Sequence, residues 1–439
     1  MRARALIVAL VAMTSAMTVD VAAANGRGGD DRDYVVVNPP LPPTDVGDQQ
    51  SVVIQGELGG AGYIIETPPV GAWNGELVMW AHGYAGEGLE LRVDPPGYGM
   101  RQHLLDLGYA WAASSYDANG YNIESGVRST QELVREFRRL VGKPQRTYLA
   151  GASMGGHVTV RSIEQYPGLY DGALPLCGVV GDVELFDFFL DFHLAAQALA
   201  GIDASPTPPN YQSVVVPELK ARLGIATGPP TNELGEQFRA IVIDRSGGER
   251  PGAAVAFESW KNFLFSLAEP DDGGPLSLNP GRVGTNVGTD YSPDAPVDID
   301  EVIERVEPGD PRARRTGALG PIATVRGRPH VPVLSLHDLG DLFVPFSMEQ
   351  EYARDVAANG REELLVQRAI RAIGHCEFSP AEVQTAFADL VTWVEDGVRP
   401  AGDDVLTPEV VADPDYGCQF SDPTGGPPGS RGAFAPCLP

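Results

Sequence analysis

The chain alternates short apolar runs with longer amphipathic stretches, and this alternation restricts its fold more than any other feature. Between residues 108 and 178 the strand-like runs GYAWAASS, RTYLAGAS and GALPLCG are separated by helix-like stretches at 124–141 and 155–165. Parallel strands need a crossover, usually a helix, so this rhythm predicts βαβ units. We therefore expect an α/β protein with a mostly parallel sheet and helices on both faces. Three further strand-like runs, SVVIQGEL, GYIIETP and ELVMWAH, come before this region.

The alternation stops near residue 180 and resumes near residue 330. The residues between contain four helical segments mixed with loops rich in Pro, Gly and Asp. The strands HVPVLSLHD and LLVQRAIR, each followed by a helix, then continue the first pattern. We predict one α/β core over residues 51–180 and 329–400, with an insertion over residues 181–328 that has the size of a small domain. A leader over residues 25–50 and a tail over residues 401–439, lying along the surface, complete the predicted organisation.

The first 24 residues have the features of a secretory signal peptide. Two arginines precede an apolar run from about residue 5 to residue 17, and small residues follow as far as Ala24. The apolar run is too short to span a bilayer of roughly 30 Å. Secretion, to the periplasm or the exterior, is the localisation we expect.

The charge balance restricts the possible partners. The chain carries 59 acidic and 32 basic residues, a formal net charge of -27. Nucleic acids and anionic lipid surfaces are bound through basic faces, so neither is an expected partner. The expected partner is a small-molecule or oligomeric substrate.

Four cysteines are present, an even number without a metal-type CxxC pair. In an exported protein this favours two disulfides. Cys418 and Cys437 share the Pro- and Gly-rich tail, so a local loop closure is the simplest partnership, leaving Cys177 to pair with Cys376. Four cysteines permit three pairings, and the other two stay open at this point.

The motif Gly151-Ala152-Ser153-Met154-Gly155 carries the strongest chemical signal. It fits G-x-S-x-G and lies where a predicted strand runs directly into a predicted helix. A nucleophile on such a tight turn needs small neighbours, and the helix N-terminus then stabilises nearby negative charge. Ser153 is therefore the candidate nucleophile.

A serine hydroxyl needs a base to remove its proton and a third group to orient that base. Among seven histidines, His375 is the best candidate base, because it lies in a Gly-flanked loop after the last predicted strand. Asp341 is the candidate acid, in the loop that leaves the preceding strand. Asp338, three residues earlier in the same loop, is its rival.

These residues give the sequence a resemblance to the α/β-hydrolase superfamily. A strand ending in His82-Gly83-Tyr84, the Ser153 turn, an insertion after the sixth strand, a D-x-x-V-P loop at Asp341 and the late His375 occur in the superfamily order. The resemblance favours Asp341 over Asp338 and implies that the insertion is a cap. WAASSYDANGY and WVEDGVRP resemble exported bacterial esterases and amidases, and His375-Cys376 is similar to tannases and feruloyl esterases. Ala152 stands where tannases have the partner cysteine, so their disulfide is absent.

The same resemblance implies an oxyanion hole made by the backbone N–H groups of Tyr84 and Met154. It also implies a secreted serine hydrolase that cleaves carboxylic esters through an acyl-enzyme, without a cofactor or a metal ion. An amidase or peptidase with the same triad is the alternative. A noncatalytic binding module on a hydrolase scaffold is the second alternative, and the complete Ser, Asp and His set argues against it.

Four other features have competing interpretations. His157, one turn into the helix after Ser153, is expected to pack or cap rather than transfer protons. His82 is expected to brace the oxyanion loop. The aromatic segment LFDFFLDF from Leu185 is either a wall above the serine or the core of the insertion. The acidic residues between 290 and 301 lack the ligand spacing of an EF-hand, so we expect a solvated loop there.

Overall fold

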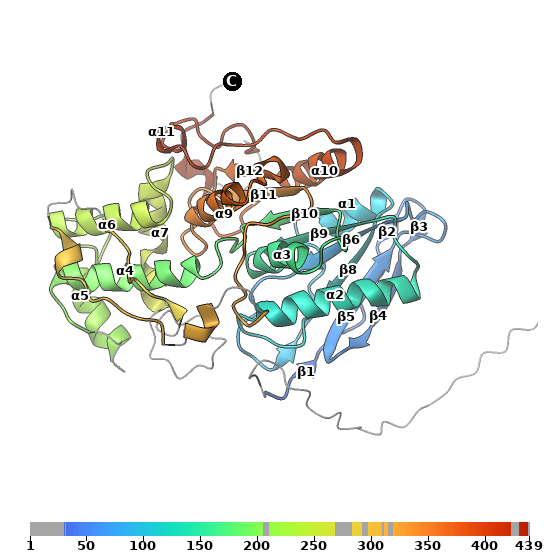
Figure 1. The fold of residues 1–439 in the computed structure, drawn as a ribbon, viewed down its shortest axis with the longest axis horizontal. Coiled ribbons are helices and arrows are strands. Elements are labelled where there is room, and N and C mark those ends of the chain that lie inside the picture. Colours follow the sequence, from blue (N-terminus) through green and yellow to red (C-terminus); the bar gives the residue numbers. More distant parts are fainter. Residues whose placement is uncertain are drawn as a thin grey trace, which may run out of the picture. The chain divides into compact units, whose positions relative to one another are not determined.

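An eight-stranded sheet forms the centre of the computed structural model (Figure 1). Its strands follow the spatial order β4-β5-β8-β6-β9-β10-β11-β12. β5 runs antiparallel to both of its neighbours, and the remaining neighbouring strands are parallel. In chain order this is 1-2-4-3-5-6-7-8 with only the second strand reversed, which is the α/β-hydrolase fold, so the predicted fold class is confirmed. The strands span Val52–Leu58 (β4), Ala61–Thr67 (β5), Glu76–Ala81 (β6), Ala110–Ser114 (β8), Arg146–Ala152 (β9), Gly172–Leu176 (β10), Val333–Asp338 (β11) and Leu365–Ile370 (β12).

The structure describes residues 30, 32–204, 210–267, 283–291, 297–309, 311–314, 319–422 and 430–437. Met1–Arg32 and Asp33–Pro439 are separate units, and all the elements described here belong to the second unit. The predicted signal peptide lies outside the described residues. None of the described helices is both long and apolar enough to cross a membrane.

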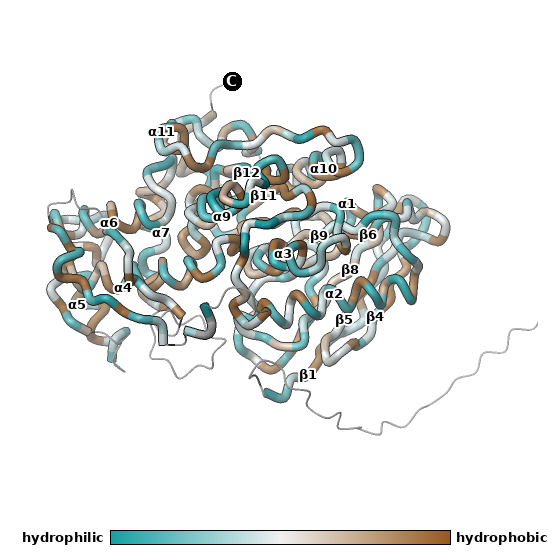
Figure 2. The backbone as a smooth tube through the Cα atoms, viewed as in Figure 1, coloured by the Kyte–Doolittle hydropathy of each residue, from teal (hydrophilic) through white to brown (hydrophobic). Residues whose placement is uncertain are grey.

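Helices cover both faces of the sheet. α2 and α3 pack on one face, and α9 contributes buried residues to the same hydrophobic core. α1 and α10 pack against each other and against the opposite face. Figure 2 shows hydrophobic residues along the central strands, whereas α2 alternates hydrophobic and hydrophilic residues, as a helix with one buried side must. These helices span Met100–Asp106 (α1), Ile123–Leu140 (α2), Met154–Gln165 (α3), Ser347–Ala358 (α9) and Pro380–Asp396 (α10).

Among the described residues between β10 and β11, in the region that we expected to form the cap, four further α-helices occur. They are packed on one another, with a core of aromatic rings. Phe192 of α4 meets Phe238 and Phe265 edge-on, with ring centroids 5.0 and 4.7 Å away. The helices span Glu184–Ala200 (α4), Val216–Arg222 (α5), Glu233–Arg245 (α6) and Ala253–Ser266 (α7).

Short elements flank the core. In the leader, β2 and β3 form a small hairpin and β1 pairs with β7, none of which the sequence pattern indicated. In the tail, a short helix and buried side chains such as Tyr416 and Phe434 pack into the protein, so the tail is not merely a surface segment as predicted. These elements span Val35–Val36 (β1), Asp45–Val46 (β2), Gln49–Gln50 (β3), Glu90–Leu91 (β7) and Pro408–Val411 (α11).

One fully buried carboxylate links β5, the strand next to the edge of the sheet, to α1. Glu66 of β5 accepts hydrogen bonds from Arg101 Nε at 2.7 Å, Trp111 Nε1 at 2.9 Å and Ser51 Oγ at 2.5 Å. A buried charge is tolerated when it is paired and hydrogen-bonded in this way. Arg101 therefore supplies the charge that Glu66 needs in order to remain buried.

We expect Arg101→Ala to lower the free energy of unfolding by about 3–5 kcal/mol, because it leaves the Glu66 carboxylate buried without a counter-charge. Urea unfolding followed by circular dichroism measures this loss. Arg92→Ala is the control, since Arg92 pairs with Glu90 and both side chains are more than half exposed. The control should change stability by at most about 1 kcal/mol, and equal effects of the two variants would contradict the prediction.

Candidate active site

Ser153 lies at the junction between the end of β9 and the start of α3. Its φ of 59° is in the left-handed region, which non-glycine residues rarely adopt. The backbone around it is fixed by hydrogen bonds: the Ser153 N–H donates to Leu176 O at 2.9 Å, and Gly156 N–H donates to Ser153 O at 2.8 Å. A strained strand-to-helix turn of this kind exposes a nucleophilic hydroxyl above the sheet.

The glycines on either side of Ser153 are required by close backbone contacts. A Cβ atom on Gly151 would lie 2.3 Å from Gly155 O, and one on Gly155 would lie 2.0 Å from Ala81 O in β6. Neither position leaves room for a side chain. The spacing of the G-x-S-x-G motif therefore follows from the distance between α3 and the two strands beneath it.

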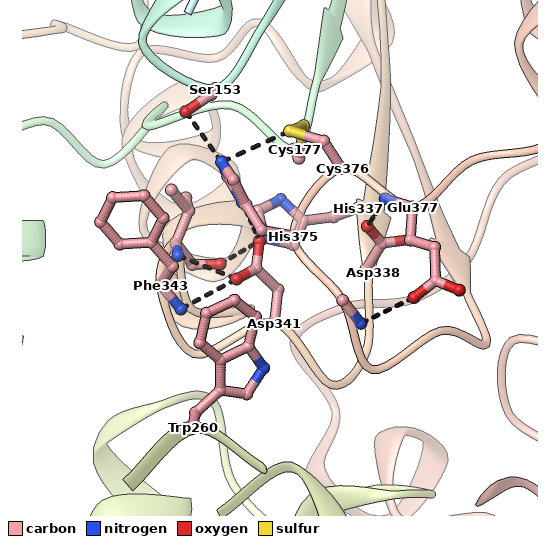
Figure 3. A network of polar contacts seen from close by, with 12 residues as sticks. Ser153, Cys177, Trp260, His337, Asp338, Asp341, Phe343, His375, Cys376 and Glu377 are labelled. Atoms are coloured by element: carbon pink, nitrogen blue, oxygen red, sulfur yellow. Dashed lines mark hydrogen bonds and ion pairs between the residues drawn. A yellow bond between two sulfur atoms is a disulfide. The ribbon is translucent and has the colours of Figure 1, made fainter. Parts of the chain in front are cut away.

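His375 joins Ser153 to Asp341 (Figure 3). Its Nε2 lies 2.9 Å from Ser153 Oγ, and its Nδ1 lies 2.5 Å from Asp341 Oδ2. His375 comes from the loop between β12 and α10, and Asp341 from the loop after β11. Three residues that are widely separated in the sequence thus form one hydrogen-bonded chain at the carboxyl ends of parallel strands.

The structure distinguishes between the two candidate acids. Asp341 is fully buried, and its second oxygen accepts hydrogen bonds from Phe343 N at 2.8 Å and Val344 N at 3.0 Å. These bonds orient the carboxylate toward His375. Asp338 instead accepts a hydrogen bond from Glu377 N at 2.7 Å. Burial, assisted by the charge of Asp341, raises the pKa of Asp338 well above its usual range.

Of the residues predicted to form the oxyanion hole, Met154 directly follows Ser153, and Tyr84 directly follows Gly83, which lies beside Ser153. Met154 is the first residue of α3, so its N–H is among those that a helix leaves without an intrahelical partner. Tyr84 follows Gly83, where an added Cβ would lie 3.3 Å from the Cβ of Ser153. The loop carrying Tyr84 therefore passes beside the nucleophile. Their joint role as oxyanion donors stays a prediction.

The other histidines near the sheet have structural partners. His157 is buried, with Nδ1 2.9 Å from Tyr121 OH and Nε2 2.6 Å from Ala323 O. Burial lowers the pKa of His157 to about 4, which favours the neutral ring. His82 stacks on Tyr116 with ring centroids 3.9 Å apart. The Nδ1 of His82 lies 2.7 Å from Gly83 O, in the loop expected to carry an oxyanion donor. Both rings therefore bond to or stack on groups other than Ser153, as expected of structural histidines.

Aromatic side chains from the helices between β10 and β11 reach the loop that carries Asp341. Phe343 meets the His375 ring edge-on at 5.0 Å, stacks on Phe189 of α4 at 6.1 Å and meets Phe263 of α7 at 4.9 Å. Trp260 Nε1 donates to Ile373 O at 2.8 Å. In the aromatic segment beginning at Leu185, Phe192 belongs to the core of the insertion and Phe189 is buried against Phe343. A wall above Ser153 stays a prediction.

Both disulfides have the pairing that we considered simplest. Cys177 is bonded to Cys376, and Cys418 is bonded to Cys437. The first bond fastens the loop of His375 to the end of β10, and Cys376 Sγ lies 3.4 Å from His375 Nε2. Two disulfides are typical of proteins that fold outside the reducing cytosol.

Among the described residues, one group of potential metal ligands lies close together, Cys177, His375 and Cys376. Its two sulfurs are bonded to each other and are not available as thiolates. In the acidic loop, Asp300 pairs with Arg305 and accepts from Tyr291 N, and Asp298 accepts from Asp300 N. Asp294 lies outside the described residues.

Known proteins share parts of this sequence and fold. Residues 64–215 match a family model described as a tannase-like family of unknown function (DUF6351). The o-phthalyl amidase of Xanthobacter agilis is 22% identical over 417 residues, covering 80% of this chain and 90% of that protein. Similar solved structures include feruloyl esterase B from Aspergillus oryzae, with a TM-score of 0.43, 14% identity, and 80% and 82% of the two chains covered. Another is an esterase from the same organism, with a TM-score of 0.41, 15% identity and 80% of each chain covered.

The predicted resemblance to tannase-like proteins and to amidases is confirmed by the family model and the curated relative. The activity named for the curated relative, an amidase, is hydrolytic. At this level, the comparison with that relative supports a hydrolase.

We expect Gly155→Ala to lower the free energy of unfolding by about 1–3 kcal/mol, because the new methyl group must push α3 away from the backbone of β6. Chemical denaturation measures the change. Gly320→Ala is the matched control, since an added Cβ there meets no atom within 4 Å. The control should stay within about 0.5 kcal/mol of the wild-type value. A Gly155→Ala protein as stable as the control would show that α3 does not rest directly on β6.

Proposed function

We propose that this protein is an exported serine hydrolase that cleaves carboxylic esters. The observation that most supports this proposal is the chain of hydrogen bonds from Ser153 Oγ through His375 to Asp341, at a serine held with positive φ. That arrangement contains a nucleophile, a base and an orienting acid in hydrogen-bonding contact, which acyl transfer requires.

In the first half of the reaction, Ser153 Oγ attacks the carbonyl carbon while His375 Nε2 takes the hydroxyl proton. Asp341 keeps the proton of His375 on Nδ1 and stabilises the imidazolium that forms. Its own orientation is fixed by the backbone N–H groups of Phe343 and Val344. His375 then donates its proton to the leaving oxygen as the C–O bond breaks, leaving an acyl-serine.

In the second half, water attacks the acyl-serine and His375 takes a proton from it. The negative charge that forms on the carbonyl oxygen in both halves requires preorganised donors. We assign these to the N–H groups of Met154 and Tyr84. Release of the acid returns the proton to Ser153 and restores the starting state.

An amide substrate is the second candidate, and one observation favours it. The curated relative that matches over 417 residues is an amidase. The Ser153, His375 and Asp341 arrangement can cleave either bond, because the choice depends on the leaving group and on the pocket. The ring of Phe343, which lies against His375 and is backed by Phe189 and Phe263, favours an apolar or aromatic acyl group in both cases.

Export is part of the proposal. Its support is the signal-peptide pattern at the N-terminus together with two disulfides, which form and persist in oxidising compartments. A noncatalytic binding role for the same scaffold predicts no chemistry at Ser153, so the experiment that tests catalysis also tests that alternative.

We expect the mature protein to hydrolyse p-nitrophenyl butyrate and p-nitrophenyl benzoate, and Ser153→Ala to lower kcat at least about 10³-fold. The matched p-nitroanilides measure amide cleavage in the same assay. Ser259→Ala, an exposed serine of α7, is the control and should retain full activity. Faster cleavage of the anilides would favour the amidase. If the protein cleaves none of these substrates and a fluorophosphonate does not label Ser153, the proposed function is contradicted.

We also expect loss of the Cys177–Cys376 bond to lower kcat before it unfolds the protein, because Cys376 adjoins His375. The variant Cys177→Ala/Cys376→Ser tests this, with a thermal melt beside each rate measurement. A change of 1 Å in the position of a reacting group can reduce a rate by about 10²-fold. A folded variant with unchanged kcat would show that the base does not depend on this bond.

A further inference from the structure

The loop that carries His375 does not form secondary structure that could hold it in place. β12 ends at Ile370 and α10 begins at Pro380, so the base lies between two elements and belongs to neither. Its backbone N–H groups must find partners elsewhere. The position of the imidazole therefore depends on whatever accepts those hydrogen bonds.

The C-terminal tail supplies an acceptor immediately before His375. Ser430 Oγ accepts hydrogen bonds from Ile373 N at 2.6 Å and from Gly374 N at 3.3 Å. Gly374 N also donates to Glu377 Oε2 at 3.0 Å, a bond visible in Figure 3. One hydroxyl group from a segment more than 50 residues later in the chain thus holds the two residues that precede the base.

The next tail residue holds the loop on the other side of His375. Arg431 Nη2 donates to Glu377 O at 2.9 Å, two residues after the base. The same guanidinium forms a bidentate pair with the carboxylate of Glu382, at 2.6 and 2.8 Å. The Glu382 side chain is 1% exposed, so this pair is shielded from solvent and salt.

The segment that contains Ser430 and Arg431 is itself anchored. Cys437 is bonded to Cys418, and Arg371 Nη2 donates to Ala435 O at 3.0 Å. Phe434 is buried and packs on Gly252, where an added Cβ would lie 2.7 Å from its ring. Residues 430–437, here named the C-terminal strap, are therefore fixed at both the disulfide and the aromatic ring.

We propose that the C-terminal strap positions the catalytic base, with Ser430 and Arg431 as positioning residues for His375. This inference rests on the proposed function. Ser430 holds the loop one and two residues before His375, and Arg431 holds it two residues after. A base must stay within hydrogen-bonding distance of the nucleophile, and small displacements reduce the rate steeply. The strap prevents such displacements without touching the substrate.

The strap also places a positive charge, that of Arg431, next to the loop that carries His375. The guanidinium of Arg431 carries this charge and pairs with the buried carboxylate of Glu382. Asp338 binds the backbone of the His375 loop, as Figure 3 shows. Arg431 therefore compensates the buried charge of Glu382 beside the loop that carries His375.

The test compares two tail serines that make the same kind of bond. Ser430→Ala should lower kcat for the p-nitrophenyl ester by about tenfold to a hundredfold with KM within about twofold, because only the base is displaced. Ser421→Ala is the matched control: Ser421 Oγ accepts from Arg371 N at 2.8 Å, four residues before His375. Its kcat should remain close to that of the wild type. Ser430→Thr keeps the hydroxyl and should restore most of the rate.

Two further variants keep the inference testable if Ser430→Ala folds poorly. Arg431→Lys retains the charge near Glu382 but loses the bidentate geometry, and should also lower kcat without raising KM. Cys418→Ser/Cys437→Ser releases the end of the strap and should likewise lower kcat without raising KM. Unchanged kcat in these folded variants, or equal losses in Ser430→Ala and Ser421→Ala, would overturn the inference.

A spectroscopic measurement separates this inference from the proposed function. The proton shared by His375 Nδ1 and Asp341 gives a downfield ¹H NMR signal, which is assigned by its loss in His375→Gln. We expect Ser430→Ala to shift or broaden this signal and Ser421→Ala to leave it unchanged. An unchanged signal in Ser430→Ala overturns the strap inference whether or not esters are cleaved. Absence of hydrolysis and of Ser153 labelling, with a shifted signal, overturns the proposed function alone.

Discussion

The direct contact between the backbone of α3 and the backbone of β6 is the constraint on which the rest of the site depends. No side chain separates them, since an atom added to Gly155 would lie 2.0 Å from Ala81 O. This contact places the start of α3 below Ser153 and brings Gly83 beside it. The hydroxyl is therefore held by packed backbone, and its position cannot change unless a helix moves relative to the sheet.

The base is held in a different way. His375 lies in a loop, and other parts of the chain fix that loop: the disulfide to Cys177, the hydroxyl of Ser430 and the guanidinium of Arg431. A nucleophile supported by regular structure thus faces a base supported by long-range contacts. Such contacts are formed only when the whole chain has folded, so the two halves of the site are expected to differ in their sensitivity to distant substitutions.

Buried carboxylates surround the base, and their partners determine what each one does. Asp341 accepts two backbone hydrogen bonds on one oxygen and faces His375 with the other. Asp338 is buried near it, and its raised pKa favours the neutral acid. Glu382 is paired with Arg431. Asp341 is therefore directed at the imidazole of His375. Asp338 instead accepts a hydrogen bond from the backbone of Glu377, and Glu382 pairs with Arg431.

The sequence by itself determined the order of strands and helices, the fold class and the residues Ser153 and His375 as candidates. These follow from local patterns, because alternating burial and the need for glycine at a tight turn act on neighbouring residues. The resemblance favoured Asp341 over Asp338, but only the tertiary structure showed that Asp341 faces His375. Asp338 is the last residue of β11 and only two residues separate it from Asp341, so the packing of this turn decides which carboxylate meets the imidazole. Only the tertiary structure showed that the tail holds the base. The tail has no periodic pattern, and the contacts of Ser430 and Arg431 arise from chain segments that meet after folding.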